Sequence, residues 1–289
     1  NGLQFAAGVN TSVWSKSVDN TGPNGKLIIT ATGTVPTNNV YWTGSTNSDW
    51  ATPTNWSDNI GPTTNATNPT HYAYITYGTP TFSTGTCVNL RGIRQWGGTL
   101  TVTGGTFTAN AQSSAETHID GTLVQTGGVV DINALEIGRT AGKTGAVVVS
   151  GGSFTVGRST TSGGVTNSLY IGSNRSTAAG TGSFVISGGS LVTRTGVKLG
   201  LPSNGGFGTF TVLGSAATQI GIAASNTDGD GTWVQNAGST LKVGIDFGGI
   251  TPIVLKDGTS TTGTSATFAA GSLLDVGYHN TGYGGGTWV

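Results

Sequence analysis

The chain has 289 residues, 51 of them glycine, and its 12 basic and 12 acidic residues give a formal net charge of zero at pH 7. This balance excludes the strongly basic surface that electrostatic binding of nucleic acid requires. Since no apolar run approaches the roughly 18 residues of a membrane-spanning helix, we expect no membrane insertion. Abundant glycine and β-branched residues favour strands and turns over helices.

Residues 1–36 are predicted to form an N-terminal arm of two strands. Apolar side chains recur with a period of two in each strand, and a turn cluster at residues 19–25 separates them. The apolar positions are Leu3, Phe5 and Val9 in the first strand and Leu27 and Ile29 in the second. The arm either packs on the chain's own repeats or adds as a donor strand to the sheet edge of a neighbouring molecule.

Residues 37–96 contain four of the eight prolines and four of the seven tryptophans of the chain. We predict that they form a turn-rich aromatic cap, because the first coil of a solenoid exposes apolar side chains and unpaired backbone groups unless something covers it. Three tryptophans stand out, Trp42, Trp50 and Trp56. They are expected to form the core of the cap; the alternative is a platform on which a glycan stacks.

Residues 97–289 repeat a short pattern about every 24 residues. Alternating apolar residues, as in Val147/Val149 and Phe184/Ile186, precede paired small residues such as Gly151-Gly152. Alternation points one parity of a strand inward, and glycine permits turns with positive φ. A repeat of this length, built from short strands and glycine turns, predicts an all-β parallel β-helix with three strands per coil.

Glu116, His118 and Asp120 alternate along one predicted strand. They share one face of it, so they could form a metal site or an acid–base pair. If Ile119 points inward, the three side chains simply face water, and that is the outcome we expect.

A second candidate is the turn with Asn226, Asp228 and Asp230. Its spacing is similar to the start of a calcium loop, but Ala237 stands where the bidentate acid is expected. We therefore expect an ordinary turn rich in Asn and Asp, with Ca²⁺ as the alternative and no other cofactor. The single cysteine, Cys87, is expected to be a buried apolar residue rather than a reactive thiol.

Two segments carry a family resemblance. The repeat around Leu169–Asn174 and Gly180–Leu191 resembles repeats of bacterial autotransporter passengers and PEP-CTERM-associated surface proteins. The Trp42-Thr43-Gly44 segment, which leads into Gly97-Gly98-Thr99-Leu100, is similar to the N-terminal cap of the same proteins. The resemblance covers about residues 41–289. It implies a right-handed β-solenoid secreted to a bacterial cell surface, and it brings no catalytic motif.

We expect from these observations a non-enzymatic extracellular structural protein that assembles with itself, head to tail, into a fibre or surface layer. The repeats run to the C-terminus without a polar capping segment, which predicts an exposed end with the apolar residues Leu273, Leu274, Val276, Trp288 and Val289. The alternatives are a monomeric adhesin that binds glycans and, less favoured, a β-helix enzyme acting on polysaccharides.

Overall fold

The structure is a computed structural model. It describes residues 14–19, 26–31, 39–62, 71–87, 90–109, 116–157, 167–172, 180–193, 196–200, 206–212, 216–220, 232–235, 240–245, 253–255, 265–271 and 273–278. Residues 1–39 and 40–289 form two compact units. Strands make up nearly all of the regular structure in these residues, and no helix among them is long and apolar enough to cross a membrane.

In the described part of the chain, the element order places one short 3-10 helix, η2 (Pro53–Asn55), among 26 strands. The strands are β1 (Trp14–Asp19), β2 (Lys26–Ala31), β3 (Asn39–Tyr41), β4 (Tyr72–Ile75), β5 (Thr81–Phe82), β6 (Thr86–Cys87), β7 (Gly92–Gln95), β8 (Thr99–Val102), β9 (Thr106–Ala109), β10 (Glu116–Ile119), β11 (Thr122–Gln125), β12 (Val129–Ile132), β13 (Ala134–Ile137), β14 (Thr144–Val149), β15 (Ser153–Val156), β16 (Asn167–Ile171), β17 (Thr181–Ile186), β18 (Ser190–Thr193), β19 (Gly196–Leu199), β20 (Phe207–Val212), β21 (Ala217–Ile220), β22 (Thr232–Gln235), β23 (Thr240–Ile245), β24 (Ile253–Leu255), β25 (Ser265–Phe268) and β26 (Leu273–Tyr278).

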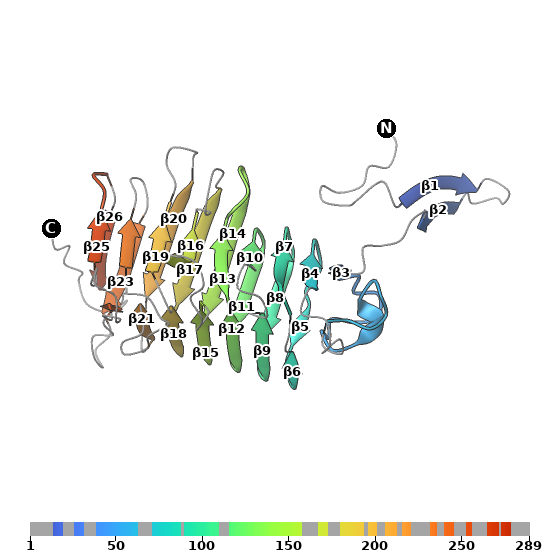
Figure 1. The fold of residues 1–289 in the computed structure, drawn as a ribbon, viewed down its shortest axis with the longest axis horizontal. Helices are drawn as coiled ribbons and strands as arrows, with labels where there is room; N and C mark the ends of the chain where they lie inside the picture. The colour runs from blue at the N-terminus through green and yellow to red at the C-terminus, as the bar shows by residue number, and fades with distance from the viewer. Residues whose placement is uncertain are drawn as a thin grey trace. The chain divides into compact units, whose positions relative to one another are not determined.

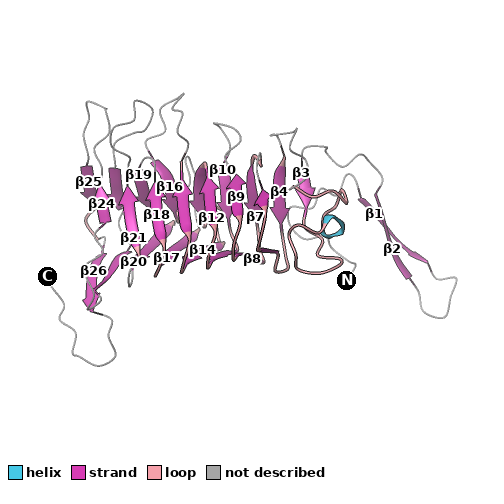
Figure 2. Cartoon of the chain, turned by 90° about the horizontal axis from the view of Figure 1, so that it is seen from below, coloured by secondary structure: helices cyan, strands magenta, loops and turns pink. Residues whose placement is uncertain are grey.

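From β4 onward the strands visit three sheets in turn, which confirms the predicted parallel β-helix. The nine-stranded sheet 1 contains β3 and every third strand from β4 to β25, sheet 2 runs from β5 to β26, and sheet 3 runs from β6 to β24. Each of these strands pairs in parallel with the strand one coil away, as in β4 with β7 and β5 with β8. Figures 1 and 2 show the coils of this unit stacked side by side.

Strand alternation fills the centre of the coils with columns of apolar side chains. In sheet 2, Leu100, Leu123, Val147, Phe184 and Phe210 follow one another in register, and all are buried. The predicted inward parity is thus correct. Because a side chain in one coil lies directly over its equivalent in the next, every coil buries the apolar face of its neighbour.

Glycines at the corners let successive coils approach closely. Gly138 and Gly152 have φ of 64° and 82°, a region that residues with a Cβ rarely adopt. A Cβ on Gly138 would also overlap the Thr181 carbonyl of another coil. The buried Gln125 amide ties one such corner together by donating to the carbonyl oxygens of Gly128 and Ser153, each at 3.1 Å.

The cap covers the first coil with three tryptophans and one asparagine. Trp50 packs edge-on against Trp56 and against Phe107 of β9, with ring centroids 4.6 and 5.1 Å apart. The Trp50 amide donates to the Thr81 carbonyl at 2.9 Å, so the cap pairs with the edge of β5. Fully buried Asn55 holds the cap loop through its side-chain amide.

The solenoid begins earlier than we predicted. Strands β4, β5 and β6 complete a first coil within residues 37–96, so the described cap is confined to the segment before Tyr72. Aromatic residues in this coil have roles other than capping. Tyr72 and Tyr74 lie on the outer parity of β4, while Ala73 and Ile75 are buried inside.

The other unit contains an antiparallel hairpin. Strand β2, which includes Leu27 and Ile29, pairs with β1 from Trp14↔Ala31 to Asp19↔Lys26. The predicted first strand at Leu3, Phe5 and Val9 lies outside the described residues. Sequence reasoning missed β1, because Lys16 interrupts the apolar parity between Trp14 and Val18.

Candidate functional site

The outer face of sheet 1 is chemically unlike the outer faces of the other two sheets. One column in register across its strands reads Tyr74, Arg94, His118, Glu136, Tyr170 and Lys198. The corresponding outer column of sheet 2 reads Thr101, Val124, Val148, Val185 and Thr211 over the same coils, followed by Lys242 and Asp275 in the last two coils. In a chain with only 8% charged residues, this column concentrates reactive side chains on one face.

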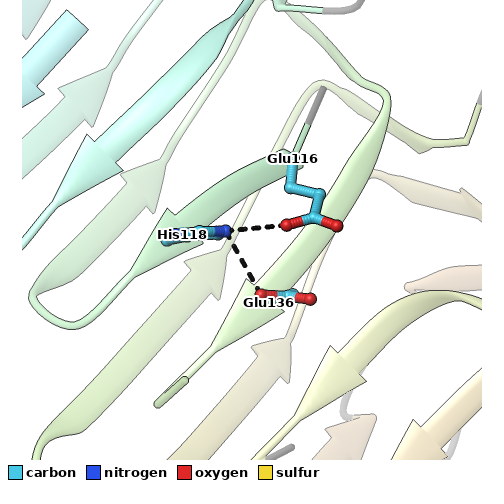
Figure 3. Close-up of side chains that lie close together, drawn as sticks. All are labelled: Glu116, His118 and Glu136. Atoms are coloured by element: carbon cyan, nitrogen blue, oxygen red, sulfur yellow. Dashed lines mark hydrogen bonds and ion pairs between the residues drawn. The ribbon is translucent and has the colours of Figure 1, made fainter. Parts of the chain in front are cut away.

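Two carboxylates converge at the imidazole of His118, one from this column and one from the same strand as His118 (Figure 3). His118 Nε2 lies 3.1 Å from Glu116 Oε2 and 3.2 Å from Glu136 Oε2. Glu116 shares the strand β10 with His118, two residues away, so the two side chains leave the same face. Glu136 comes from the next coil, because β13 pairs with β10 in the register His118↔Glu136.

Two arginines complete the cluster. Arg94 of β7 contacts His118 Nε2 through Nη1, and its guanidinium lies 4.3 Å from the centre of the Tyr72 ring. Arg139, just after β13, places Nη1 2.8 Å from His118 Nδ1 and Nε 2.8 Å from Glu136 Oε2. The two arginines and the two glutamates balance in charge. We call these five residues, Arg94, Glu116, His118, Glu136 and Arg139, the His118 cluster.

The cluster is largely shielded from water although it lies on an outer face. The side chains of His118 and Glu136 are 3% and 1% exposed, while those of Glu116 and Arg139 are 18% and 39% exposed. Burial lowers the pKa of His118 to about 4, further lowered by Arg94 and Arg139 and partly opposed by its hydrogen bond with Glu116. His118 is therefore neutral at pH 7.

A guanidinium has only N–H donors, and one faces each ring nitrogen of His118, Arg139 at Nδ1 and Arg94 at Nε2. A neutral imidazole has a single acceptor nitrogen, so the ring can accept a hydrogen bond from only one of the two arginines. The carboxylates of Glu116 and Glu136 lie beside Nε2. Every acid and base of the His118 cluster is therefore engaged with another member.

The cluster also contains the donor set of a small metal ion. Glu116, His118 and Glu136 each offer one ligand atom, all within 4.8 Å of one another, and such N/O sets bind zinc and similar ions. Both ring nitrogens, however, are in contact with guanidinium groups. A divalent cation here would face two arginines at close range, so we assign the cluster as a charge network and not as a metal centre.

The prediction that Glu116, His118 and Asp120 face water was wrong. Ile119 does point inward, but the long side chains of neighbouring coils cover His118, and Asp120 is 5% exposed. Asp120 also takes no part in the cluster, because its carboxylate accepts hydrogen bonds from Thr140 N at 3.2 Å and Thr140 Oγ1 at 2.5 Å.

Sequence reasoning missed three members of the cluster, Arg94, Glu136 and Arg139. The coil from His118 to Glu136 is shorter than the predicted period of about 24 residues, so counting by that period does not align them. One local signal could have aligned His118 with Glu136. Each of these two residues is followed by an isoleucine and, within two further positions, by a corner glycine, at Ile119–Gly121 and at Ile137-Gly138.

The tryptophan platform is also corrected. Trp42, Trp50 and Trp56 are 3%, 0% and 1% exposed, so their ring faces are not available to a glycan. Trp56 Nε1 donates to the Trp50 carbonyl at 2.8 Å, which satisfies its polar atom inside the cap. These rings form the cap core, which was the reading we favoured.

The other predicted residues are either placed by the structure or lie outside the described residues. Cys87 is buried, and desolvation raises the pKa of its thiol to about 12, so it has little thiolate character at pH 7. Backbone pairing places Leu273, Leu274 and Val276 in β26, opposite β23. The remaining positions, Asn226, Asp228, Asp230, Trp288 and Val289, lie outside the described residues.

Comparisons of the chain with protein-family models, with curated proteins and with solved structures found no match. The function therefore has to be argued from the geometry of the chain itself.

Proposed function

We propose that this chain is a non-enzymatic extracellular structural protein that assembles head to tail by strand addition. The observation that carries the proposal is the set of edge strands at the end of the coils. Among the described residues, β24, β25 and β26 each pair on one side only. A row of unpaired backbone N–H and C=O groups is a template for another strand.

The hairpin of residues 1–39 supplies a partner of suitable chemistry. The register places Trp14, Lys16 and Val18 opposite Ala31, Ile29 and Leu27. Strand alternation assigns these six residues to one face, which is mostly apolar, and assigns serines, Thr30 and charged residues mainly to the other. An isolated two-stranded sheet is at best marginally stable in water, so this hairpin needs a further sheet to pack on or to extend.

The two features together favour a fibre. Addition of the hairpin of one molecule to the edge strands of the next is a heterologous contact, and such contacts give filaments when they do not close into rings. The cap pairs with the edge of β5 at the other end of sheet 2, which leaves that end less suited to strand addition. The proposed partner is thus a second copy of the chain, outside the cell.

The mutual engagement of the acids and bases supports a role without catalysis. A general acid or base must reach the proton that it transfers, whereas His118 has a guanidinium at each ring nitrogen and its carboxylate neighbours contact it. A reaction at the cluster would first have to dismantle it.

The proposal is tested by negative-stain microscopy of the purified full chain beside two single variants, Ile29→Lys and Thr30→Lys. The variants introduce the same charge at adjacent residues of β2 that alternation assigns to opposite faces. We expect filaments from the full chain and from Thr30→Lys, and at least tenfold fewer from Ile29→Lys. Uniform single particles from the unmodified chain at high concentration would refute the proposal.

A further inference from the structure

We propose that the His118 cluster is an acid-sensitive latch that joins three successive coils on the outer face of sheet 1 and opens when His118 takes up a proton. Arg94, His118 and Glu136 come from β7, β10 and β13, which are neighbours in that sheet. The latch would be a conformational device of the solenoid, independent of whether the chain forms filaments.

Hydrogen-bond chemistry makes the neutral ring essential to the latch. The neutral ring has one acceptor nitrogen, which accepts from Arg139 at Nδ1 or from Arg94 at Nε2. A second proton occupies that nitrogen, so each ring nitrogen then carries an N–H that faces a guanidinium, which has only donors. The one attractive contact between the ring and the arginines would become repulsive.

Protonation of His118 also makes the charge balance of the cluster less favourable. The neutral cluster has two guanidinium cations and two carboxylate anions, and protonation adds a third cation at a side chain that is 3% exposed. An uncompensated charge in such a place is costly. The side chain of Arg139 is 39% exposed, compared with 18% for Glu116, so we expect Arg139 to move into solvent.

The groups that surround the cluster do not offset the added proton. On β4, the Tyr72 ring stacks with Arg94 and also with Arg91, and Tyr74 is the register neighbour of Arg94. On β16, Tyr170 is the register neighbour of Glu136. Asp120 directly follows β10, and its carboxylate accepts a hydrogen bond from the Thr140 hydroxyl. None of these contacts supplies a new anion to His118.

Departure of Arg139 would uncover Glu136, whose side chain is 1% exposed and which forms its ion pair with Arg139 at 2.8 Å. The pairing of β10 with β13 would then loosen. In the coils next to the cluster, the outer columns of sheets 2 and 3 are mostly Thr, Ser, Val and Ala, with Asp131 in β12; Lys242 and Asp275 lie in β23 and β26, several coils away. Acid should therefore open sheet 1 locally and leave the other two sheets paired.

The sign of the stability change follows from the direction of the shift. Burial lowers the pKa of His118 from 6.5 to about 4 in the folded chain. Above pH 6.5 the ring is neutral in both states, and it contributes no pH dependence. As the pH falls from 6.5 toward 4, the unfolded chain binds a proton that the folded chain does not, so stability is lost across this window.

The test is a pH titration of the three histidines by NMR together with thermal unfolding. The expected result for His118 is a midpoint near 4, with chemical-shift changes confined to β7, β10 and β13. Between pH 6.5 and 4.5 we expect the Tm to fall by roughly 5 °C. The variant His118→Gln, which cannot titrate, should lose that component, whereas His71→Gln, a buried histidine outside the cluster, should keep it.

Two further variants keep the proposal falsifiable if His118→Gln does not fold. Arg139→Gln removes the guanidinium at Nδ1, so the midpoint of His118 should rise toward 6.5 and the shift changes should weaken. Lys143→Gln, which removes a cation outside the cluster, should leave the midpoint unchanged. A His118 midpoint of 6 or above in the unmodified chain, or equal pH dependence in His118→Gln, would overturn the latch.

Discussion

At the scale of single residues, a few buried polar side chains hold irregular parts of the chain in place. Asn55 is fully buried and makes four hydrogen bonds through its side chain. Its Oδ1 accepts from the amides of Thr46 and Asn47 at 2.9 and 3.0 Å, and its Nδ2 donates to Asn47 Oδ1 and the Asp49 carbonyl at 2.7 and 2.8 Å. One amide thus organises the loop that carries Trp50.

We therefore predict that Asn55→Ala destabilises the cap by roughly 2–4 kcal/mol, since it leaves several polar groups without partners. Asn55→Asp retains the acceptor but loses both donors, so its loss should be intermediate. The neighbouring exposed position provides a control, and Thr54→Ala should change stability by less than about 1 kcal/mol. Urea unfolding followed by tryptophan fluorescence measures all three. Equal stability of Asn55→Ala and Thr54→Ala would contradict the role given to Asn55.

Residue patterns predicted the interior of the coils well and the outer clusters poorly. The alternation of Val147 and Val149 was sufficient, because a strand inside a solenoid has one buried parity whatever its neighbours are. The partnership of His118 with Glu136 depends on the length of one particular coil. Burial of His118 depends on long side chains from two other coils, and neither follows from a single strand.

At the scale of elements, the corners decide how closely coils can stack. Gly138 and Gly142 both have positive φ, of 64° and 73°, and lie four residues apart around the turn between β13 and β14. They differ in what surrounds them. A Cβ on Gly138 would overlap the Thr181 carbonyl, whereas a Cβ on Gly142 would meet no heavy atom within 4 Å.

Alanine substitutions at these two glycines separate the free-energy cost of a left-handed backbone from the cost of steric overlap with another coil. Gly142→Ala should lose only the roughly 1–2 kcal/mol of a left-handed residue with a side chain. Gly138→Ala has that loss and must also displace the β17 backbone, so we predict at least about 4 kcal/mol or failure to fold. Chemical denaturation of both variants makes the comparison. A difference below about 1 kcal/mol would mean that the coils are less closely stacked than described.

Some elements could be assigned from sequence and others could not. The predicted strand with Leu27 and Ile29 corresponds to β2, which begins at Lys26, whereas β1, which ends at Asp19, was not predicted. The end of the cap was misplaced because proline and aromatic residues continue into the first coil. Composition alone does not separate an aromatic residue on an outer column, such as Tyr74, from one inside a cap.

At the scale of the whole molecule, stability is a chain of contacts between neighbouring coils. Phe184 in sheet 2 is fully buried, and its ring lies 5.7 Å from Phe154 and 5.3 Å from Phe210. In a repeat protein each coil contacts only its neighbours. Damage at one coil should therefore remain local before the chain unfolds as a whole.

Phe184→Ala should lower stability by roughly 3–5 kcal/mol through the cavity that it leaves. Its signature should be regional, with faster hydrogen exchange in peptides from β14, β17 and β20 and unchanged exchange in the cap at residues 39–62. Val185→Ala, on the outer face of the same strand, is the matched control and should alter exchange little. Uniformly faster exchange across the cap and all coils would show that the solenoid unfolds as a single cooperative unit.

The parallel stacking of the coils has a mechanical consequence. Interstrand hydrogen bonds run from each coil to the next, so a pull along the stacking direction acts along these bonds and not across them. Such a load is resisted by only three short strands at a time, and coils would detach singly from an end. Each freed coil of roughly 24 residues would lengthen the chain by about 80 Å, so the solenoid would yield in steps and dissipate sudden tension.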